Sequence, residues 1–294
     1  MSGLDLAGVV PPTVTAFDEA GDLDPAATAA HARFVVERGA RAVFPLGTNG
    51  EFALLDREER RRAVEAVADA VDAPVIAGVG APSTRATVGH AERAAAAGAD
   101  GVVAVTPYYY PLDEDSAVEH YRAVADAVDL PVYVYHIPGR TGNELSLETI
   151  ERIAAIDGVA GLKDSSKDVP WLGQAIDAAP DLEFLVGSDS LLFAGLEIGC
   201  TGLVSAVANA FPELVVGLYD AYTTGDESEA QRLQSTVFEV RSALKRGPYM
   251  AGVKTALSLR DVGFDVGGLR APLRTMDEEG RDRLERELTA LGLL

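Results

Sequence analysis

The strongest constraint on the fold is a regular alternation of apolar runs with charged, alanine-rich segments. The apolar runs, rich in β-branched residues, lie at 8–17, 42–47, 74–80, 101–107, 131–138, 159–166, 183–189 and 202–207. Segments between them, such as 56–72 and 115–129, have the period of an amphipathic helix. A continuous β-branched run suits a strand that is buried on both faces of a parallel sheet. The eight units predict a (β/α)₈ barrel, with a doubly wound open sheet as the alternative.

The joints between these units are repeated along the chain. Residues 66–75 read AVADAVDAPV and residues 123–132 read AVADAVDLPV, an offset of 57 residues that corresponds to two units. After residue 208 the pattern becomes wholly helical, with helices expected over 212–224, 226–246, 249–262 and 277–292. We expect the first of these to complete a catalytic barrel over 1–224 and the other three to form a helical region over 225–294 that packs on it.

The charge balance excludes several classes of partner. The 294 residues carry 46 acidic and 25 basic side chains, a net charge of −21, which disfavours nucleic acid and anionic membranes as partners. A single cysteine, Cys200, excludes an internal disulfide framework. The N-terminus has no basic, apolar leader and no run is long enough for a membrane helix, so we expect a cytoplasmic protein.

The basic residues are unusual in kind. Lysine occurs only at positions 163, 167, 245 and 254, and arginine supplies the rest of the positive charge. An acidic, lysine-poor chain is similar in composition to proteins of salt-loving cells, where high salt screens the repulsion between carboxylates. An acidic protein of an ordinary mesophile is the alternative.

The active site of a barrel lies at the carboxyl ends of its strands, so polar residues at those ends are the candidates for chemistry. Lys163 stands in an apolar strand, where burial lowers the pKa of an amine and makes it a nucleophile able to form a Schiff base with a carbonyl. A lysine that pairs with Asp164, one that reaches the rim of the barrel, or one that binds phosphate are the other interpretations.

Other strand ends carry further candidates. Tyr135 can exchange a proton with a carbonyl or an enamine, or it can be a core aromatic residue. The turn at Thr48 and Asn49 presents backbone N–H groups suited to a carboxylate, although this sequence is first of all a turn. Tyr109 belongs to an aromatic corner, and Arg140 is either a surface charge or an anion clamp.

Metal and dinucleotide chemistry find little support. Three of the four histidines, His31, His90 and His120, fall in expected helices, and no spacing typical of metal ligands occurs. No glycine-rich dinucleotide fingerprint follows the first strand. The sequence therefore predicts neither a metal site nor a dinucleotide cofactor.

Together, four segments resemble the dihydrodipicolinate synthase / N-acetylneuraminate lyase family. They are Gly47–Glu51, Thr106–Tyr109, Tyr135–Gly142 and Gly161–Asp164, in family order and at similar spacing. The resemblance covers nearly the whole chain. It implies a (β/α)₈ barrel, commonly a homotetramer, that forms a Schiff base between a lysine and pyruvate or another 2-oxo acid and needs no cofactor.

The resemblance also implies roles for individual residues. Lys163 would form the imine, Tyr135 would be the acid/base, and Thr48 would pass protons to it. Thr48 and Asn49 would bind the pyruvate carboxylate through their backbone N–H groups. The other implied residues are Tyr109, which completes the relay and in many members comes from the adjacent subunit, Arg140, which holds the carboxylate of the second substrate in the synthases, and Gly187 and Val204, which line the pyruvyl pocket.

The exact reaction depends on departures from the synthase pattern. Synthases usually have a second threonine where this chain has Asn49, Asn where it has His136, and Glu where it has Asp164. The Lys163-Asp164 pair, the Gly50–Phe52 segment and the Tyr108–Pro111 run resemble the 2-keto-3-deoxy-sugar-acid aldolases, whereas Arg140 is a synthase feature. We therefore expect a 2-keto-3-deoxygluconate or 6-phosphogluconate aldolase, with 4-hydroxy-tetrahydrodipicolinate synthase, another lyase or hydratase of the family, or a 2-oxo acid sensor without turnover as alternatives.

Overall fold

Parallel strands curl into a barrel in the computed structural model, which describes residues 4–294. Within these residues the sheet has seven strands, in the spatial order β1-β7-β6-β5-β4-β3-β2. They are β1 (Gly8–Val9), β2 (Ile76–Gly78), β3 (Gly101–Val105), β4 (Val132–His136), β5 (Val159–Asp164), β6 (Glu183–Val186) and β7 (Gly202–Leu203). The barrel is confirmed and the open sheet is excluded. Residues 1–3, the start of the segment expected to lack a leader, lie outside the described residues.

The strand predicted over 42–47 closes the ring without forming a regular ladder. It makes one isolated bridge, between Val43 and Val75. On one side the Phe44 N–H donates to the carbonyl of Pro11 at 3.0 Å, and on the other the Ile76 N–H donates to the carbonyl of Val43 at 2.9 Å. Pro45 has no N–H to donate and Leu46 has a left-handed φ of 60°, so the ladder cannot continue.

The first predicted strand is also shorter than expected. The run over 8–17 contributes only Gly8 and Val9 to β1. The Val10 N–H still donates to the carbonyl of Leu203 at 2.8 Å, but Pro11 and Pro12 come next, and a proline removes a ladder donor, which ends regular pairing.

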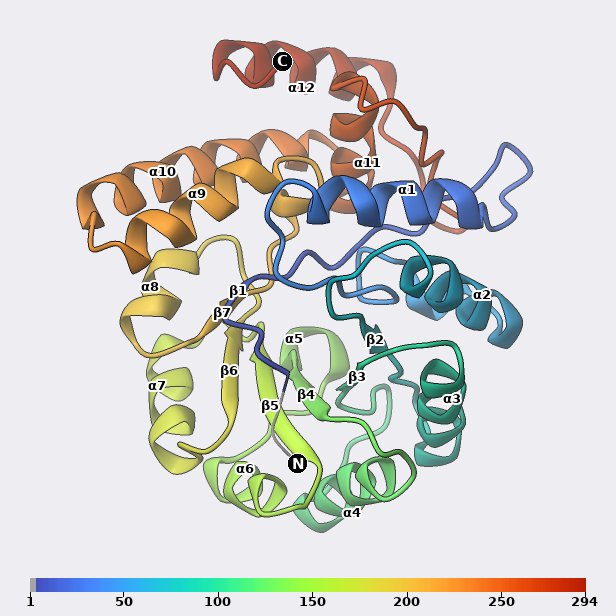
Figure 1. The fold of residues 1–294 in the computed structure, drawn as a ribbon, viewed down its shortest axis with the longest axis vertical. Helices are drawn as coiled ribbons and strands as arrows, with labels where there is room; N and C mark the ends of the chain where they lie inside the picture. The colour runs from blue at the N-terminus through green and yellow to red at the C-terminus, as the bar shows by residue number, and fades with distance from the viewer. Residues whose placement is uncertain (1–3) are drawn as a thin grey trace.

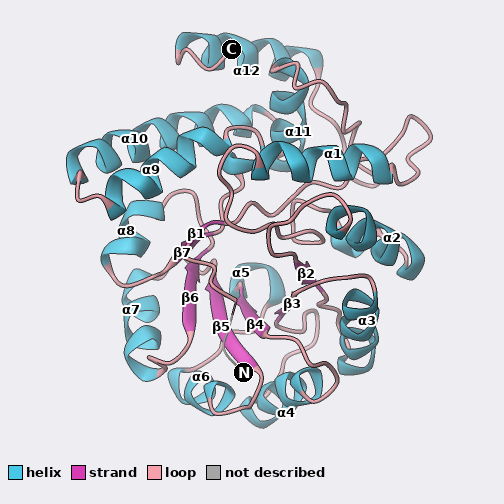
Figure 2. Ribbon diagram, in the orientation of Figure 1, coloured by secondary structure: helices cyan, strands magenta, loops and turns pink. Residues whose placement is uncertain are grey.

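Helices surround the strands as a ring, which Figure 2 shows in cyan around the magenta strands. The α-helices among the described residues are α1 (Pro25–Val36), α2 (Arg57–Ala68), α3 (Thr84–Ala96), α4 (Glu114–Ala125), α5 (Pro138–Thr141), α6 (Leu147–Ala154), α7 (Val169–Ala178), α8 (Leu192–Glu197), α9 (Pro212–Thr223), α10 (Glu227–Ala243), α11 (Tyr249–Leu259) and α12 (Glu278–Ala290). The helices predicted over 56–72 and 115–129 end earlier, at Ala68 and Ala125. There the chain tightens into a turn, with the Ala70 N–H bound to the Val67 carbonyl and the Ala127 N–H bound to the Val124 carbonyl.

The last three helices form a layer outside the ring. Figure 1 shows α10 beside α9, with α11 and α12 stacked beyond them. No helix among residues 4–294 is both long enough and apolar enough to cross a membrane.

The N-terminal segment closes one end of the barrel. The Leu6 N–H donates to Glu183 Oε1 at 2.8 Å, and the hydroxyl of Tyr133 donates to the carbonyl of Leu4 at 3.2 Å. Leu6 also joins the apolar cluster inside the barrel, with Val10, Phe44 and other inward-facing side chains. Access to the barrel interior is therefore from the opposite end, where the strands have their carboxyl ends.

Candidate active site

A cavity of about 530 Å³ lies at the carboxyl ends of the strands. The predicted site residues that line it are Thr48, Asn49, Tyr135, Arg140, Lys163, Gly187 and Val204. They come from the turn after residue 47, from β4, β5 and the segments after β4, β6 and β7, so the barrel brings together residues that are up to 156 positions apart (204 minus 48). Tyr109 is the one predicted site residue that does not line this cavity.

Lys163 is buried at the centre of the cavity, with 4% of its surface exposed. Tyr135 and Lys163 are register partners on the adjacent strands β4 and β5, and the Lys163 Nζ lies 3.3 Å from the centroid of the Tyr135 ring. The Nζ donates a hydrogen bond to Ser165 Oγ at 3.1 Å. Within residues 4–294 it forms no ion pair with a carboxylate. The amine and the phenol therefore meet without a neutralising partner.

This environment changes the protonation of both groups. Burial lowers the pKa of the Lys163 amine, against the opposing effect of Tyr135, Asp164 and Asp189. Burial by itself would raise the pKa of the Tyr135 phenol, but the adjacent Lys163 and hydrogen-bonding groups of Lys163, Thr48 and Ser165 lower it overall. A less basic amine and a more acidic phenol suit a nucleophile and its proton-transfer partner.

The turn after residue 47 presents free donors to the cavity. The backbone N–H groups of Thr48 and Asn49 have no acceptor among residues 4–294. The Thr48 hydroxyl lies 3.5 Å from the Tyr135 hydroxyl, a long hydrogen bond. Unpaired backbone donors beside a hydroxyl suit the binding of an anionic group such as a carboxylate.

Gly187 allows the strands to approach the amine closely. A Cβ at this position would overlap Ser165 Oγ and lie 3.0 Å from Lys163 Cε. The Gly187 carbonyl accepts a hydrogen bond from Ser165 Oγ at 2.9 Å. Val204, buried on the other side, supplies an apolar wall. Ser165 was not predicted, although its place two residues after Lys163, beyond the end of β5, could have identified it.

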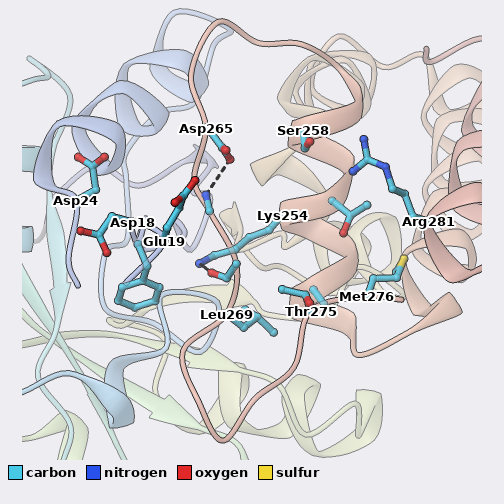
Figure 3. Close-up of a pocket in the computed structure, with 15 residues that line it drawn as sticks. Asp18, Glu19, Asp24, Lys254, Ser258, Asp265, Leu269, Thr275, Met276 and Arg281 are labelled. Carbon is cyan, nitrogen blue, oxygen red and sulfur yellow. Dashed lines mark hydrogen bonds between the residues drawn. The ribbon is translucent and has the colours of Figure 1, made fainter. Parts of the chain in front are cut away.

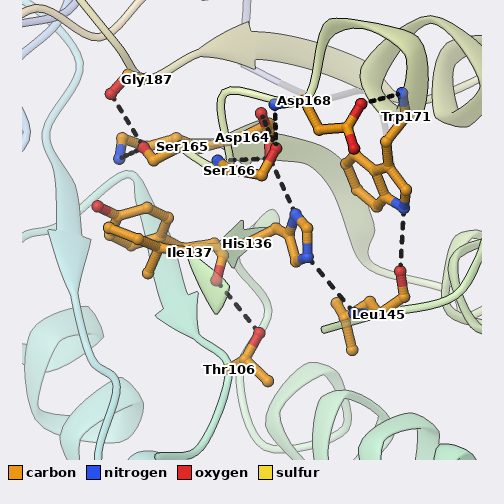
Figure 4. Close-up of polar contacts among 12 residues, drawn as sticks. Thr106, His136, Ile137, Leu145, Asp164, Ser165, Ser166, Asp168, Trp171 and Gly187 are labelled. Atoms are coloured by element: carbon orange, nitrogen blue, oxygen red, sulfur yellow. Dashed lines mark hydrogen bonds and ion pairs between the residues drawn. The ribbon is translucent and has the colours of Figure 1, made fainter. Parts of the chain in front are cut away.

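Asp164, the partner that the sequence suggested for Lys163, pairs with His136 instead. Alternate residues of a strand point to opposite faces, so Asp164 lies on the outer face of β5. Its Oδ1 lies 2.8 Å from His136 Nδ1, and both side chains are buried. The ring of Trp171 stacks on His136 with 4.1 Å between centroids. Figure 4 shows His136 between Asp164 and Leu145, with Trp171 beside it.

The outer half of the cavity is basic. Arg140, which lies on the short helix α5, lines it together with Lys167 and Arg241. None of the three forms an ion pair in the part of the chain that the structure describes. Burial, and then the charges of Arg241 and Lys167, lower the pKa of Lys245, which places that lysine near the same group. The sequence did not predict the residues from α10 and α11, because their approach to the cavity depends on helix packing.

Tyr109 and the adjacent Tyr110 are the most exposed of the large apolar side chains among residues 4–294. The Tyr109 side chain is 84% exposed, and its backbone has a left-handed φ of 83°, which is uncommon for a residue other than glycine. The ring packs edge-on against Tyr110, itself 68% exposed. The structure therefore does not bring Tyr109 to Tyr135 of the same chain.

A second cavity of about 530 Å³ lies between α11 and the loops that carry Asp18 and Asp265 (Figure 3). It contains another buried lysine, Lys254, whose Nζ lies 3.0 Å from Glu51 Oε1 and donates to the Gly268 carbonyl at 2.6 Å. Lys254 therefore forms an ion pair, whereas Lys163 forms none among the described residues. The ion pair also ties the turn at Thr48 and Asn49 to α11.

Comparison with known proteins extends this picture. The family model described as the dihydrodipicolinate synthetase family matches residues 5–291. An uncharacterised DapA-like lyase of Halobacterium salinarum is 68% identical over 99% of this chain and 96% of its own. A 4-hydroxy-tetrahydrodipicolinate synthase of Natronomonas pharaonis is 36% identical over 97% of both chains.

Solved structures have the same fold. YagE, a prophage protein of the dihydrodipicolinic acid synthase family from Escherichia coli K12 solved with pyruvate, has a TM-score of 0.93 and 31% identity, over 98% of this chain and 99% of that chain. KD(P)GA of T. tenax, an aldolase of the KDPG type, has a TM-score of 0.89 and 28% identity, over 97% and 98%. The chain therefore belongs to the dihydrodipicolinate synthetase family and is a carbon–carbon lyase.

Proposed function

We propose that the protein forms a Schiff base between Lys163 and a 2-oxo acid and cleaves or forms a C–C bond through a pyruvate enamine. The observation that carries the proposal is the buried, unpaired amine of Lys163, 3.3 Å from the centroid of the Tyr135 ring, in a cavity whose free N–H groups suit a carboxylate. The complex of the related YagE with pyruvate supports pyruvate as the keto acid.

The residues that line the cavity can carry out each step of the proposed reaction. The Nζ lone pair of Lys163 attacks the C2 carbonyl, Tyr135 protonates the departing hydroxyl, and water leaves as a positively charged iminium forms. The deprotonated Tyr135 then takes the proton from the C4 hydroxyl and the C3–C4 bond breaks as the aldehyde leaves. The electron pair of that bond forms the C2=C3 double bond of the enamine, and the π pair of the iminium moves to the nitrogen. Tyr135 passes the proton to C3, and attack by water on the resulting iminium releases pyruvate and restores both the amine and the phenol. The N–H groups of Thr48 and Asn49 hold the carboxylate beside C2 throughout.

We propose 2-keto-3-deoxygluconate 6-phosphate, or its unphosphorylated form, as the substrate, giving pyruvate and glyceraldehyde 3-phosphate or glyceraldehyde. The free cations Lys167 and Arg241 in the outer half of the cavity support a substrate with a second anionic group, in a chain whose net charge is −21. The contact between His136 and Asp164 makes these two departures from the synthase pattern one coupled change and not two independent ones.

A specific observation also favours the alternative, 4-hydroxy-tetrahydrodipicolinate synthase. Arg140 lines the cavity as an unpaired cation, at the position that the family resemblance assigns to the carboxylate of the second substrate. Relatives such as that of Natronomonas pharaonis carry this name. In this reaction the same pyruvate enamine would attack aspartate semialdehyde.

We also propose a homotetramer in which Tyr109 of one chain completes the proton relay of another. The support is the exposure of Tyr109 and Tyr110, since an exposed aromatic pair is typical of a contact surface. This arrangement would explain why Tyr109 does not reach Tyr135 within one chain.

The decisive experiment traps the imine. The protein is incubated with pyruvate and borohydride, and peptide mass mapping should find one reduced pyruvyl adduct, on Lys163. Lys163→Arg should show none, whereas Lys167→Arg, the matched control on the neighbouring loop, should still carry it. An adduct on Lys245 or Lys254 instead would refute the assignment. Cleavage assays with 2-keto-3-deoxygluconate and its 6-phosphate, beside a synthase assay, then separate the two candidate reactions.

A further inference from the structure

The outer faces of β4 and β5 carry a buried polar pair directly behind the proposed catalytic pair. The register aligns Tyr135 with Lys163 and, one residue further, His136 with Asp164. Because neighbouring side chains on a strand point to opposite faces, the first pair faces the cavity and the second faces the helices. We infer that the His136–Asp164 pair holds Tyr135 and Lys163 in register and supplies a fixed negative charge behind the iminium. This inference rests on the proposed function.

The hydrogen bonds around His136 fix its proton. The backbone N–H of Leu145 donates to Nε2 at 3.4 Å, so the ring proton is assigned to Nδ1, which donates to Asp164. Stacking on Trp171 holds the ring, and the Trp171 indole N–H donates to the Leu145 carbonyl at 3.2 Å. The imidazole therefore has one orientation, and its donor is aimed at the carboxylate.

The Asp164 carboxylate is surrounded by donors. Oδ1 also accepts from the Ser166 N–H at 3.1 Å, and Oδ2 accepts from the Ser166 hydroxyl at 2.9 Å. These three donors surround a buried carboxylate that is next in sequence to Lys163. Such preorganised charge stabilises a positive group that forms during a reaction.

The charges near Lys163 come from three elements. Tyr135 belongs to β4, Asp164 to β5, and Asp189 follows β6; all three oppose the lowering of the Lys163 pKa by burial. Asp189 is anchored differently: its Oδ1 accepts from Ser205 Oγ at 2.5 Å, and its Oδ2 accepts from the Tyr249 hydroxyl at 2.7 Å. Of these two carboxylates, only Asp164 contacts β4, the strand that carries Tyr135, through His136. Asp164 can therefore both fix the alignment of β4 with β5 and place a negative charge near Lys163.

The test replaces Asp164 with Asn, which keeps the shape and removes the charge. The rate of imine trapping with pyruvate is followed against pH. Loss of the charge makes the Lys163 amine less basic, so the midpoint of the profile should move to lower pH by roughly half a unit or more. Asp168→Asn is the matched control: it makes the same change at an exposed helix N-cap, where Asn caps as well as Asp. Its midpoint should stay with the wild type.

Two substitutions of His136 test the positioning role separately. Asn retains an N–H donor near Nδ1, whereas Leu retains none. His136→Asn should keep most of kcat, and His136→Leu should lose about ten- to a hundredfold in kcat with a smaller change in KM, since small displacements at a reacting centre have effects of this size. These variants also serve if Asp164→Asn does not fold.

The outcomes separate this inference from the function on which it rests. If wild-type protein traps no pyruvate, the proposed function fails. If wild-type and Asp164→Asn protein both trap pyruvate with the same midpoint, the charge role is overturned. Equal kcat in folded His136→Asn and His136→Leu protein would overturn the positioning role.

Discussion

Two buried lysines of this chain illustrate how burial and pairing differ in their consequences. Lys163 on β5 and Lys254 on α11 are each 4% exposed, and burial lowers the pKa of both. Lys254 lies 3.0 Å from Glu51 and 4.6 Å from the centroid of the Phe17 ring, so a carboxylate neutralises it. Lys163 has a hydroxyl and an aromatic face instead.

The difference assigns the two side chains to different tasks. An ion-paired amine is held as an ammonium and stabilises the fold, since removal of one partner leaves an uncompensated buried charge. An unpaired amine is available as a nucleophile. Its burial destabilises the fold, so a structural role would not explain its presence. Burial alone would therefore misidentify Lys254 as a second candidate nucleophile.

The largest effects are expected when each of the two lysines is replaced with Met. Lys163→Met should abolish imine formation and turnover and leave the melting temperature equal or higher. Lys254→Met should cost about 3–5 kcal/mol of folding stability while its folded fraction still traps pyruvate. Thermal unfolding and borohydride trapping measure the two effects. The double variant Lys254→Met, Glu51→Gln should recover part of the stability; equal destabilisation by both single lysine variants would contradict the contrast.

Tyr135→Phe removes the hydroxyl beside the unpaired lysine and keeps the ring. General acid–base assistance contributes about 10²–10⁴-fold, so kcat should fall by this amount while the fold is retained. Steady-state kinetics with circular dichroism as the fold control measure the effect. Turnover close to wild type would remove the phenol from the mechanism.

The cations of the outer cavity should affect which substrate is bound and should not affect imine formation by Lys163. Arg140→Ala, Lys167→Ala and Arg241→Ala should each spare imine formation with pyruvate alone. Loss of a charged hydrogen bond corresponds to about ten- to a hundredfold in kcat/KM for the anionic substrate. Comparison of the phosphorylated sugar acid, its unphosphorylated form and aspartate semialdehyde identifies which cation serves which anion. Loss of trapping in these variants would mean that they hold pyruvate.

The smallest expected effect is that of salt concentration on subunit assembly. Salt should leave the buried Lys254–Glu51 ion pair intact. At 0.01 M salt the Debye length is about 30 Å, so chains with a charge of −21 repel one another across an interface, whereas near 1 M it is about 3 Å. Lower salt should therefore reduce assembly and activity together, by a few fold, before the chain unfolds. Sedimentation, turnover and circular dichroism across a salt series test this. Full assembly and activity in dilute buffer would contradict a salt-adapted surface.

The sequence predicts the barrel well because its signal is repeated. Runs such as 101–107 and 131–138 became β3 and β4 with only terminal residues trimmed. The predictions fail where proline or a left-handed residue interrupts the backbone, at Pro11 and at Leu46. These local features remove hydrogen bonds that an apolar pattern alone implies.

The site residues also fall into those that the sequence predicts and those that it does not. Lys163 and Tyr135 stand out because a polar group in an apolar strand is expensive to bury. The His136–Asp164 pair and the approach of Arg241 depend on strand register and helix packing, which no single segment specifies. Once Tyr135 is aligned with Lys163, however, the pairing of the next residues follows from the register.

The position of α10 and α11 at the mouth of the cavity has a consequence for how such an enzyme can change. Arg241 and Tyr249 border the outer half, whereas the proposed chemistry uses groups on β4 and β5. A substitution on these helices can alter which aldehyde or sugar acid fits without disturbing the register that aligns the amine and the phenol. Divergence of substrate within one reaction type can then proceed through residues 227–259 while the inner barrel stays unchanged, and exchange of these helices between relatives offers a direct route to new specificities.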